Sequence, residues 1–366
     1  MEIDEICRQM KNLWKKTFGD NDDYIDLIFS NYFKREFIEF RVEDGQIIAA
    51  MLAIPYEFLV SGKIVHGLYL CGLATCPEYR GQGIMSGLIN AIHERFQNSN
   101  FYFSFLIPAG QSLIHYYENN GYIPLILRSK IMIQIRDNNE KKLLNKSINK
   151  DIKKDDIILK NLETKNDLDV ERICDFIMSC EASNKNNFEI LHTRKDIEII
   201  IKENELSGGD ILYIFDEWNV IHGVIFMTIE DERKRLKIPR IFHKNPLYLK
   251  PIIEYITQKF SFLELDIYFY PEEKENYTYI FESLKNEIKY NYGNLSSVIM
   301  TDEIYGMVRT INENENLKFT NNSSRDLEYS ILVNPEKNEN MDSITSAENP
   351  RNKFTKQWPR ISMMLD

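Results

Sequence analysis

The chain has 366 residues, 43% hydrophobic and 12% aromatic, with a formal net charge of −11. This length favours two domains over one, and the apolar content is sufficient for packed cores. The acidic charge argues against nucleic acid as the main partner. No apolar run approaches a membrane span, and the acidic start Met1–Glu5 does not resemble a signal peptide. Five irregularly spaced cysteines indicate neither disulfides nor a metal site, so we expect a cytoplasmic protein without metal.

The first third of the chain shows alternating strand and helix patterns with clear turn residues between them. Asp44-Gly45 and Ser61-Gly62 predict hairpin turns, Pro77 ends a strand, and Gly121 ends a helix. Apolar spacing and these breaks predict helices at 3–14, 24–33, 84–96 and 111–119, and strands at 37–42, 47–54, 68–74, 101–107, 123–127 and 130–135.

The most informative segment is residues 73–86, where a strand ends at Pro77 and a glycine-bearing turn opens into a helix. Gly81 and Gly83 let the backbone approach a ligand closely. The N–H groups of the helix's first turn lack intrahelical partners, and Arg80 adds a charged donor. This pattern indicates a pyrophosphate site, although a plain strand-to-helix turn is the alternative. Neither a Walker loop nor a dinucleotide fingerprint has this spacing.

At these residues the chain resembles the GCN5-related N-acetyltransferases, whose signature is Arg/Gln-x-x-Gly-x-Gly/Ala. Arg80 and Gly83 match it, while Met85 stands where Gly or Ala is usual. The segment 117–122 matches the family's Tyr-x-x-x-Gly-Tyr/Phe pattern. The resemblance implies that acetyl-CoA is the cofactor. The residues expected to bind it are Leu73, Ala74, Thr75, Arg80, Gly81, Gln82, Gly83, Ile84, Met85 and Ser86.

The same resemblance implies that Tyr117 protonates the departing thiolate, while Tyr116 is expected to pack or to face solvent. The general base stays open: His93 is expected at the surface, and His115 and Glu57 are weaker candidates. No cysteine or serine has an adjacent activating group, and we expect Cys71 and Cys76 only to pack. Direct attack by the amine is therefore favoured over an acyl-enzyme.

The second half repeats the element pattern of the first without its glycines, because His243-Lys244-Asn245-Pro246 occupies the corresponding loop and Pro246 lacks an amide donor. Strands are expected at 157–159, 211–215, 220–229, 236–242 and 263–270, and helices at 168–178, 194–201, 247–260 and 277–288. We interpret this half as a degenerate acetyltransferase-like domain, with an unrelated α/β domain as the alternative.

The expected organisation is an α/β (α+β) fold of tandem domains, each with a mixed, mostly antiparallel sheet flanked by helices. The domains are 1–136, a polar linker at 137–156, the degenerate domain at 157–310, and a largely disordered tail at 311–366 with a docking C-terminus. This layout is similar to tandem acetyltransferases of the enhanced-intracellular-survival type. That resemblance implies that the terminal carboxylate, here on Asp366, accepts a proton in the active site.

These observations predict an acetyl-CoA-dependent N-acetyltransferase that acts on a primary amine of a small molecule or peptide. A binding protein of another class, a non-catalytic acyl-CoA-responsive regulator or scaffold with the same fold, is the alternative. Membrane and nucleic-acid partners are not expected, and a homo-oligomer is left open.

Overall fold

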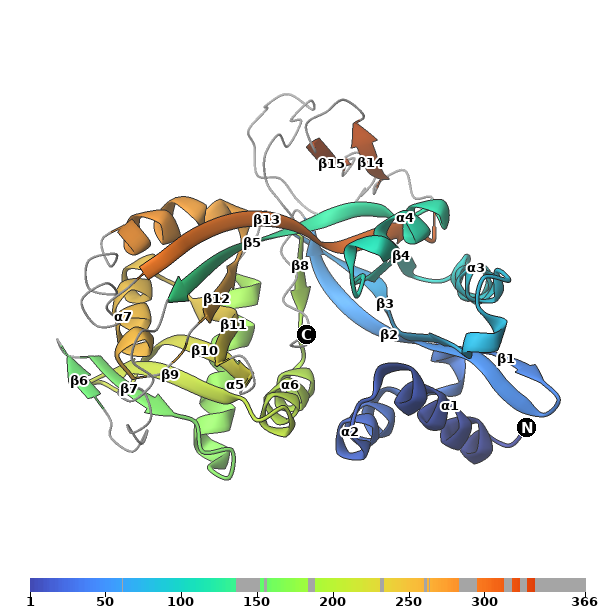
Figure 1. Ribbon diagram of the computed structural model, residues 1–366, viewed down its shortest axis with the longest axis horizontal. Coiled ribbons are helices and arrows are strands. Elements are labelled where there is room, and N and C mark those ends of the chain that lie inside the picture. Colours follow the sequence, from blue (N-terminus) through green and yellow to red (C-terminus); the bar gives the residue numbers. More distant parts are fainter. Residues whose placement is uncertain are drawn as a thin grey trace, which may run out of the picture. The chain divides into compact units, whose positions relative to one another are not determined.

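A computed structural model of the chain describes residues 1–60, 62–135, 152–154, 157–183, 188–230, 234–259, 262, 264–282, 295–312, 318–322 and 328–332. The chain divides into two compact units (Figure 1). Met1–Ile126 and the described residues from Ile304 onward belong to the first unit, and most of the residues between them form the second. The expected linker at 137–156 and tail at 311–366 lie largely outside the described residues.

The first unit is built on a mixed sheet in which strand pairs are mostly antiparallel. Its elements are α1 (Ile3–Phe18), α2 (Asp22–Tyr32), η1 (Arg35–Phe37), β1 (Ile38–Glu43), β2 (Gln46–Val60), β3 (Lys63–Thr75), η2 (Pro77–Tyr79), α3 (Ile84–Phe96), β4 (Phe101–Leu106), α4 (Gln111–Asn119), the start of β5 (Ile123–Ile135) and the end of β13 (Leu295–Thr310). The strand order is β1-β2-β3-β4-β13-β5. The mixed α/β fold with a mostly antiparallel sheet is thereby confirmed.

Helices cover both faces of this sheet (Figure 1). Leu88, Ile89 and Ile92 of α3 pack into one cluster with Leu68 and Leu70 of β3. On the opposite face the indole of Trp14, in α1, lies against the backbone of β3. Because both faces are covered, β2 is an almost continuous run of buried residues and not an alternating strand.

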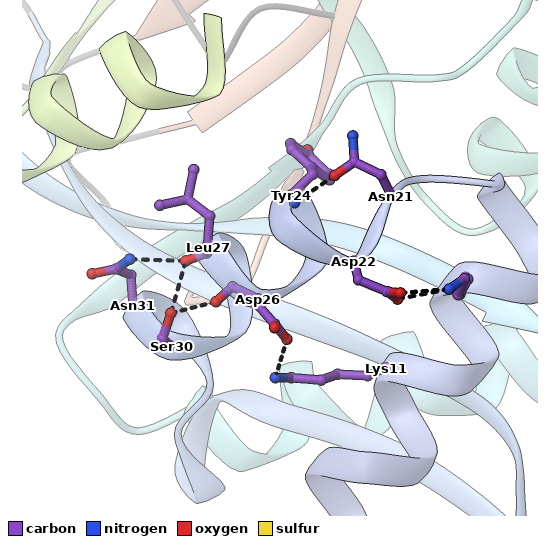
Figure 2. Close-up of polar contacts among 9 residues, drawn as sticks. Lys11, Asn21, Asp22, Tyr24, Asp26, Leu27, Ser30 and Asn31 are labelled. Atoms are coloured by element: carbon purple, nitrogen blue, oxygen red, sulfur yellow. Dashed lines mark hydrogen bonds and ion pairs between the residues drawn. The ribbon is translucent and has the colours of Figure 1, made fainter. Parts of the chain in front are cut away.

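Helices α1 and α2 are held together mainly by their apolar side chains, and polar contacts lie on their exposed surface. Asn21 caps α2 by accepting a hydrogen bond from the Tyr24 N–H, and Lys11 pairs with Asp26 at 2.6 Å (Figure 2). Exposed ion pairs of this kind contribute about 0–1 kcal/mol each. Trp14 and Phe29 are both buried and lie edge-on with 5.7 Å between ring centroids, and this contact joins the apolar sides of the two helices.

The closing strands expected at 123–127 and 130–135 are wrong as separate elements, because β5 runs without a break from Ile123 to Ile135. The polar pair Arg128-Ser129 resembles a turn in sequence. In the structure Arg128 instead pairs with Glu303, and the Ser129 hydroxyl donates to Asp302 at 2.6 Å. Polar side chains inside a strand are therefore satisfied by a neighbouring strand, and no turn is needed.

Strand β13 adds to the sheet of the first unit a strand that the expected domain 1–136 does not include. Its residues 307–310 pair antiparallel with β4, as in Met307 opposite Leu106. It lies between β4 and β5 in the sheet, and Gly306 allows the close approach, since a Cβ there would lie 2.6 Å from Ile126. The first unit is thus not contiguous in sequence, and it extends beyond the boundaries 1–136.

The strands of the second unit follow the order β5-β12-β11-β10-β9-β7-β6. Its elements are β6 (Ile152–Lys154), β7 (Ile157–Asn161), α5 (Asp167–Ala182), β8 (Phe188–Leu191), α6 (Arg194–Leu206), β9 (Asp210–Asp216), β10 (Ile221–Glu230), β11 (Arg235–His243), η4 (Pro246–Tyr248), α7 (Leu249–Lys259), β12 (Glu264–Phe269) and η5 (Pro271–Glu273). Its sheet is mostly antiparallel, with one parallel pair, β11 and β12. A separate hairpin joins β14 (Lys318–Asn322) to β15 (Glu328–Leu332).

Among the helices that the structure describes, none combines the length and the apolar character that a membrane crossing requires.

Replacing Asn312 by Ala tests how strongly the late segment is tied to the first unit. The Asn312 amide donates to the carbonyls of Ser99 and Phe101 at 2.9 and 2.7 Å. Losing two such bonds should lower the free energy of unfolding by about 1–3 kcal/mol, measured by urea denaturation. Asn100→Ala, at an exposed position, is the matched control and should change it by less than about 0.5 kcal/mol. Equal effects of the two variants would show that the hydrogen bonds of Asn312 do not tie this segment to the first unit.

Candidate active site

The site begins where two parallel strands separate. Strand β3 pairs with β4 only as far as Tyr69 opposite Phe105, yet β3 continues to Thr75. Its other edge stays paired with β2 up to Ala49 opposite Thr75. From Leu70 to Thr75 no described strand is paired with the side of β3 that faces away from β2. Leu73, Ala74 and Thr75 lie along this open segment.

A β-bulge at Gly72 shapes this open segment. Ala50 lies opposite Ala74 and Leu52 opposite Cys71, so two residues of β3 stand opposite Met51. Gly72 has φ of +60°, a conformation that favours glycine, and a Cβ there would lie 2.1 Å from the ring of Trp14. The bulge therefore depends on a glycine and on the indole packed against it, and it redirects the main chain at the opening.

The glycine turn leads directly into α3. Gly81 and Gly83 have φ of +76° and +74°, and a Cβ built at either position meets nothing within 4 Å. The first helical hydrogen bond runs from the Gly87 N–H to the Gly83 carbonyl. The N–H groups of Ile84, Met85 and Ser86 come before it, and the described part of the chain offers them no partner. These three donors point outward from the positive end of a 13-residue helix.

Two side chains flank the turn and fold back onto its backbone. The Arg80 Nε donates to the Thr75 carbonyl at 3.0 Å, which leaves the two terminal nitrogens of an exposed guanidinium without a partner among the described residues. The Gln82 amide donates to the Glu78 carbonyl at 3.3 Å. The guanidinium of Arg80 thus lies close to the helix N-terminus, where its charge can attract an anion.

Tyr117 lies on α4 and is 7% exposed, within the same apolar cluster that Leu73, Ile84 and Met85 pack against. Burial, with a smaller effect of Tyr116, raises the pKa of Tyr117 to about 12. No hydrogen-bond partner for its hydroxyl is found in the described residues. The phenol therefore keeps its proton through the neutral range and has a donor to offer.

Tyr116 has a hydrogen-bond partner in the structure. The sequence analysis expected it only to pack or to face solvent, which does not describe this contact. Its hydroxyl shares a hydrogen bond with the Ser86 hydroxyl at 3.1 Å, which links α4 to the first turn of α3. Helical spacing separates Tyr116 from Tyr117 in direction, but only the packing of α3 on α4 determines this contact. No signal in the sequence identifies it.

His93 is buried at 7% exposure, so the expectation of a surface residue is wrong. Its Nε2 shares a 2.7 Å hydrogen bond with the Ser104 hydroxyl, which in turn bonds the Tyr122 hydroxyl at 2.7 Å. Burial first, and then the positive charge of Arg309, lowers the pKa of His93 to about 3. The ring is neutral at physiological pH and belongs to a buried polar chain behind Tyr117, whose ring lies edge-on to Tyr122.

The structure does not bring Glu57 or His115 to the opening. Glu57 of β2 pairs with His66 of β3, and His66 comes four residues before Leu70. The His115 side chain is 82% exposed and lies 3.5 Å from Glu118. Cys71 and Cys76 are partly buried, and neither is in a disulfide with a described residue. Asp366 lies outside the described residues, so its role stays a prediction.

These observations fit a pantetheine-linked pyrophosphate. Three unpartnered amides, a free guanidinium and a turn without side chains suit two phosphates, and an open strand edge suits an extended amide-bearing arm. Tyr117 stands beside the same opening with a protonated hydroxyl. The arrangement can hold an acylated thiol along β3 and stabilise a thiolate that leaves it.

Replacing Gly72 by Ala should destabilise the protein, because the new Cβ overlaps Trp14 and the positive φ strains any side chain. We expect the free energy of unfolding to fall by at least about 3 kcal/mol, measured by chemical denaturation without ligand. Gly87→Ala is the control: it lies in α3 with nothing within 4 Å of its Cβ. That substitution should stabilise the protein by about 0.5–1 kcal/mol, and a Gly72→Ala variant as stable as wild type would contradict the bulge.

His93 makes stability depend on pH in a defined direction. Its folded-state pKa of about 3 lies below the ordinary value of 6.5, so the unfolded chain binds the extra proton. Stability from this group is complete above pH 6.5 and falls by up to about 1.4 kcal/mol per unit as the pH drops toward 3. Urea unfolding at pH 7, 6 and 5 should show that slope reduced in His93→Gln. An unchanged slope in the variant would exclude a buried neutral ring.

Comparisons with known proteins agree with this geometry. Residues 4–125 match the family model of the acetyltransferase (GNAT) domain. A conserved protein of unknown function from Enterococcus faecalis V583, described as a probable N-acyltransferase, is 13% identical with a TM-score of 0.59, over 84% of this chain and 70% of that one. A GCN5-related N-acetyltransferase from Anabaena variabilis is 14% identical with a TM-score of 0.57, over 90% and 81%.

Eis1 from Mycobacterium abscessus is 8% identical with a TM-score of 0.57, over 94% of this chain and 84% of that one. No curated protein sequence matches significantly. The solved structures establish the fold, including the expected likeness to the enhanced-intracellular-survival type, and the family model establishes the domain. Residues 4–125 of this chain therefore belong to the GNAT acetyltransferase family.

Proposed function

We propose that the protein transfers an acetyl group from acetyl-CoA to a primary amine by direct attack of the amine on the thioester. The observation that carries this proposal is the early end of the β3–β4 pairing beside three unpartnered amides of α3. The amides of Ile84, Met85 and Ser86, with Arg80, would hold the pyrophosphate. Gly81, Gln82 and Gly83 form the turn that lets it approach.

The opened edge of β3 would hold the rest of the cofactor. Main-chain groups from Leu73 to Thr75 can bond the amides of the pantetheine arm as a neighbouring strand would. The bulge at Gly72 turns further main-chain donors toward the thioester, where an N–H can stabilise the oxyanion of the attacked carbonyl. When bound, acetyl-CoA supplies an activated acyl group, and these residues align it.

Tyr117 is the proposed proton donor to the leaving thiolate. A phenol whose pKa is about 12 stays protonated, so the donor is present throughout the working range. The apolar surroundings that raise the pKa of Tyr117 also disfavour a thiolate without a hydrogen bond. A hydrogen bond from Tyr117 to the thiolate is therefore stronger there than in water. Attack requires the neutral amine, and the group that removes the ammonium proton is not identified by the described residues. Asp366 is retained as the proposed base.

We further propose that only the first unit binds the cofactor. In the second unit the parallel pairing of β11 with β12 also ends early, at Ile238 opposite Ile267. Beyond that point side chains of β11 contact the segment that follows β12. The Arg240 guanidinium lies 3.7 Å from the ring centroid of Tyr270, and the His243 Nε2 bonds Glu273 at 2.7 Å. These contacts support the interpretation of a degenerate domain and a ratio of one acyl-CoA per chain.

Tyr117→Phe separates an enzyme from a regulator that only binds acyl-CoA. Losing the proton donor should lower kcat by about 10²-fold or more with little change in cofactor affinity, measured by thiol release from acetyl-CoA across a panel of amines. Tyr116→Phe, on the same helix, is the matched control: kcat should be kept while KM for acetyl-CoA rises by up to about tenfold. A wild-type protein that binds coenzyme A yet releases no thiol with any amine would favour the regulator.

A further inference from the structure

Tyr116 and Ser86 form a hydroxyl pair that joins α4 to the first turn of α3. The two oxygens lie 3.1 Å apart, and both side chains are half-buried. Ser86 is the third residue of α3 and follows Ile84 and Met85, whose main-chain N–H groups belong to the proposed pyrophosphate site. The pair therefore lies where the helix that carries Tyr117 meets the helix end that would bind the anion.

The Ser86 hydroxyl is used differently from other serine hydroxyls in the helices of this chain. Ser30 donates to the Asp26 carbonyl one turn earlier, and Ser179 donates to the Phe176 carbonyl at 2.6 Å. Such serines use their only proton within their own helix. Among the described residues, the hydrogen-bond partner of the Ser86 hydroxyl is instead a hydroxyl of another helix.

The two hydroxyls of the pair are not equivalent as donors. A phenol is a stronger acid than an aliphatic alcohol, so Tyr116 is the better donor and the Ser86 oxygen is the better acceptor. A serine hydroxyl can accept a hydrogen bond and still donate its own proton. Donation by Tyr116 therefore leaves the Ser86 proton for a third group. It also polarises the Ser86 hydroxyl and strengthens the bond that this hydroxyl donates.

The geometry of α3 directs this proton toward the anion site. In an α-helix the Cα–Cβ bond tilts toward the N-terminus, so the Ser86 hydroxyl lies over the first turn of the helix. The preceding turn leaves room for a ligand, because a Cβ at Gly81 or Gly83 meets nothing within 4 Å. A hydroxyl that donates to a phosphate oxygen forms a charge-assisted bond, roughly twice as strong as a bond between neutral groups.

Tyr116 is itself held in place by its neighbours. Its carbonyl accepts a hydrogen bond from the Asn120 side-chain amide at 2.8 Å, and its ring lies edge-on to that of Tyr117 with 5.2 Å between centroids. It also packs against the buried cluster that includes Leu88 of α3. Because these contacts fix the phenol, it can orient the Ser86 hydroxyl before a ligand arrives, which lowers the entropy cost of binding.

We propose that Tyr116 is a positioning residue for the cofactor: its phenol donates to the Ser86 oxygen and thereby holds the Ser86 proton toward the pyrophosphate. The inference rests on the proposed binding of acetyl-CoA, and it adds one oriented side-chain donor to the main-chain donors of the same site. Tyr116 does not contact the cofactor, so its effect on affinity passes through Ser86. Its neighbour Tyr117 has a different role, because it acts on the thiolate.

A double-mutant cycle on the full-length protein tests this proposal, with the dissociation constant of coenzyme A measured by calorimetry. Ser86→Ala should raise the constant by about tenfold, and Tyr116→Phe by about threefold to tenfold. The double variant should match Ser86→Ala, because Tyr116 acts only through the serine hydroxyl. Ser86→Thr keeps the hydroxyl and should bind as wild type does. Independent roles would multiply the two losses to about thirtyfold or more, which would overturn the proposal.

S-acetylpantetheine separates a role at the phosphates from a purely structural one, because this thioester lacks the pyrophosphate and the nucleotide. In thiol-release kinetics, Tyr116→Phe should raise KM for acetyl-CoA and leave KM for S-acetylpantetheine unchanged. An equal rise for both thioesters would mean that Tyr116 only holds α4 against α3. Ser179→Ala is the matched control, since it removes a helical serine hydroxyl in the second unit and should change neither KM.

Failure of this inference and failure of the proposed function give different results. If the wild-type protein does not bind coenzyme A, the proposed function is wrong and the inference is wrong with it. If wild type and Ser86→Ala bind coenzyme A equally well, the function stands and the Ser86 hydroxyl does not contact the phosphates. If Tyr116→Phe does not fold, Ser86→Ala and Ser86→Thr still decide, because equal affinities of these two variants contradict the proposal.

Discussion

The first unit depends on a pairing that stops early. Among the described strands, β3 is paired on both sides up to Tyr69 and with β2 alone thereafter. Unpartnered main-chain groups near a protein interior cost free energy, so a fold keeps them only where something else holds the strand in place. Here Trp14 packs on the Gly72 bulge from one face, and the cluster around Leu70 and Leu88 packs from the other. The rigid surroundings make the open edge a stable feature that a ligand can use.

The support for this opening comes from distant parts of the chain. Strand β13 completes the sheet next to β4, and its residue Arg309 donates to Asn90 of α3 at 2.9 Å. Arg309 also lies against Gly121, where a Cβ would come within 3.4 Å of its Nε. The segment that follows α4 is therefore fixed by a strand encoded near residue 305. A domain that looks complete in the first 136 residues takes part of its sheet from the second half of the chain.

The sequence predicts the parts of the site that depend on local backbone chemistry. Gly81 and Gly83 have the positive φ that the motif requires, and α4 has the bounds that apolar spacing and Gly121 indicate. Features that depend on tertiary packing cannot be predicted from the sequence in this way. The bulge at Gly72 needs Trp14, and the partner of Tyr116 needs the packing of α3 on α4.

His93 illustrates the same limit. It lies one residue beyond the apolar stripe of its helix, which indicates exposure, yet Ser104 and Tyr122 give it buried partners. Likewise Arg128-Ser129 has the composition of a turn, and β13 satisfies both side chains within a strand. In both cases the sequence analysis is wrong about a polar residue because its hydrogen-bond partner comes from a segment distant in the sequence.

Hydrogen exchange measured by mass spectrometry on the full chain, with and without acetyl-CoA, tests most directly whether main-chain donors hold the cofactor. The account predicts slower exchange for amides of residues 70–75 and 81–86 when acetyl-CoA is present, with no comparable change along β11 and α7. Unchanged exchange in both first-unit segments, under conditions where calorimetry shows the cofactor bound, would contradict it.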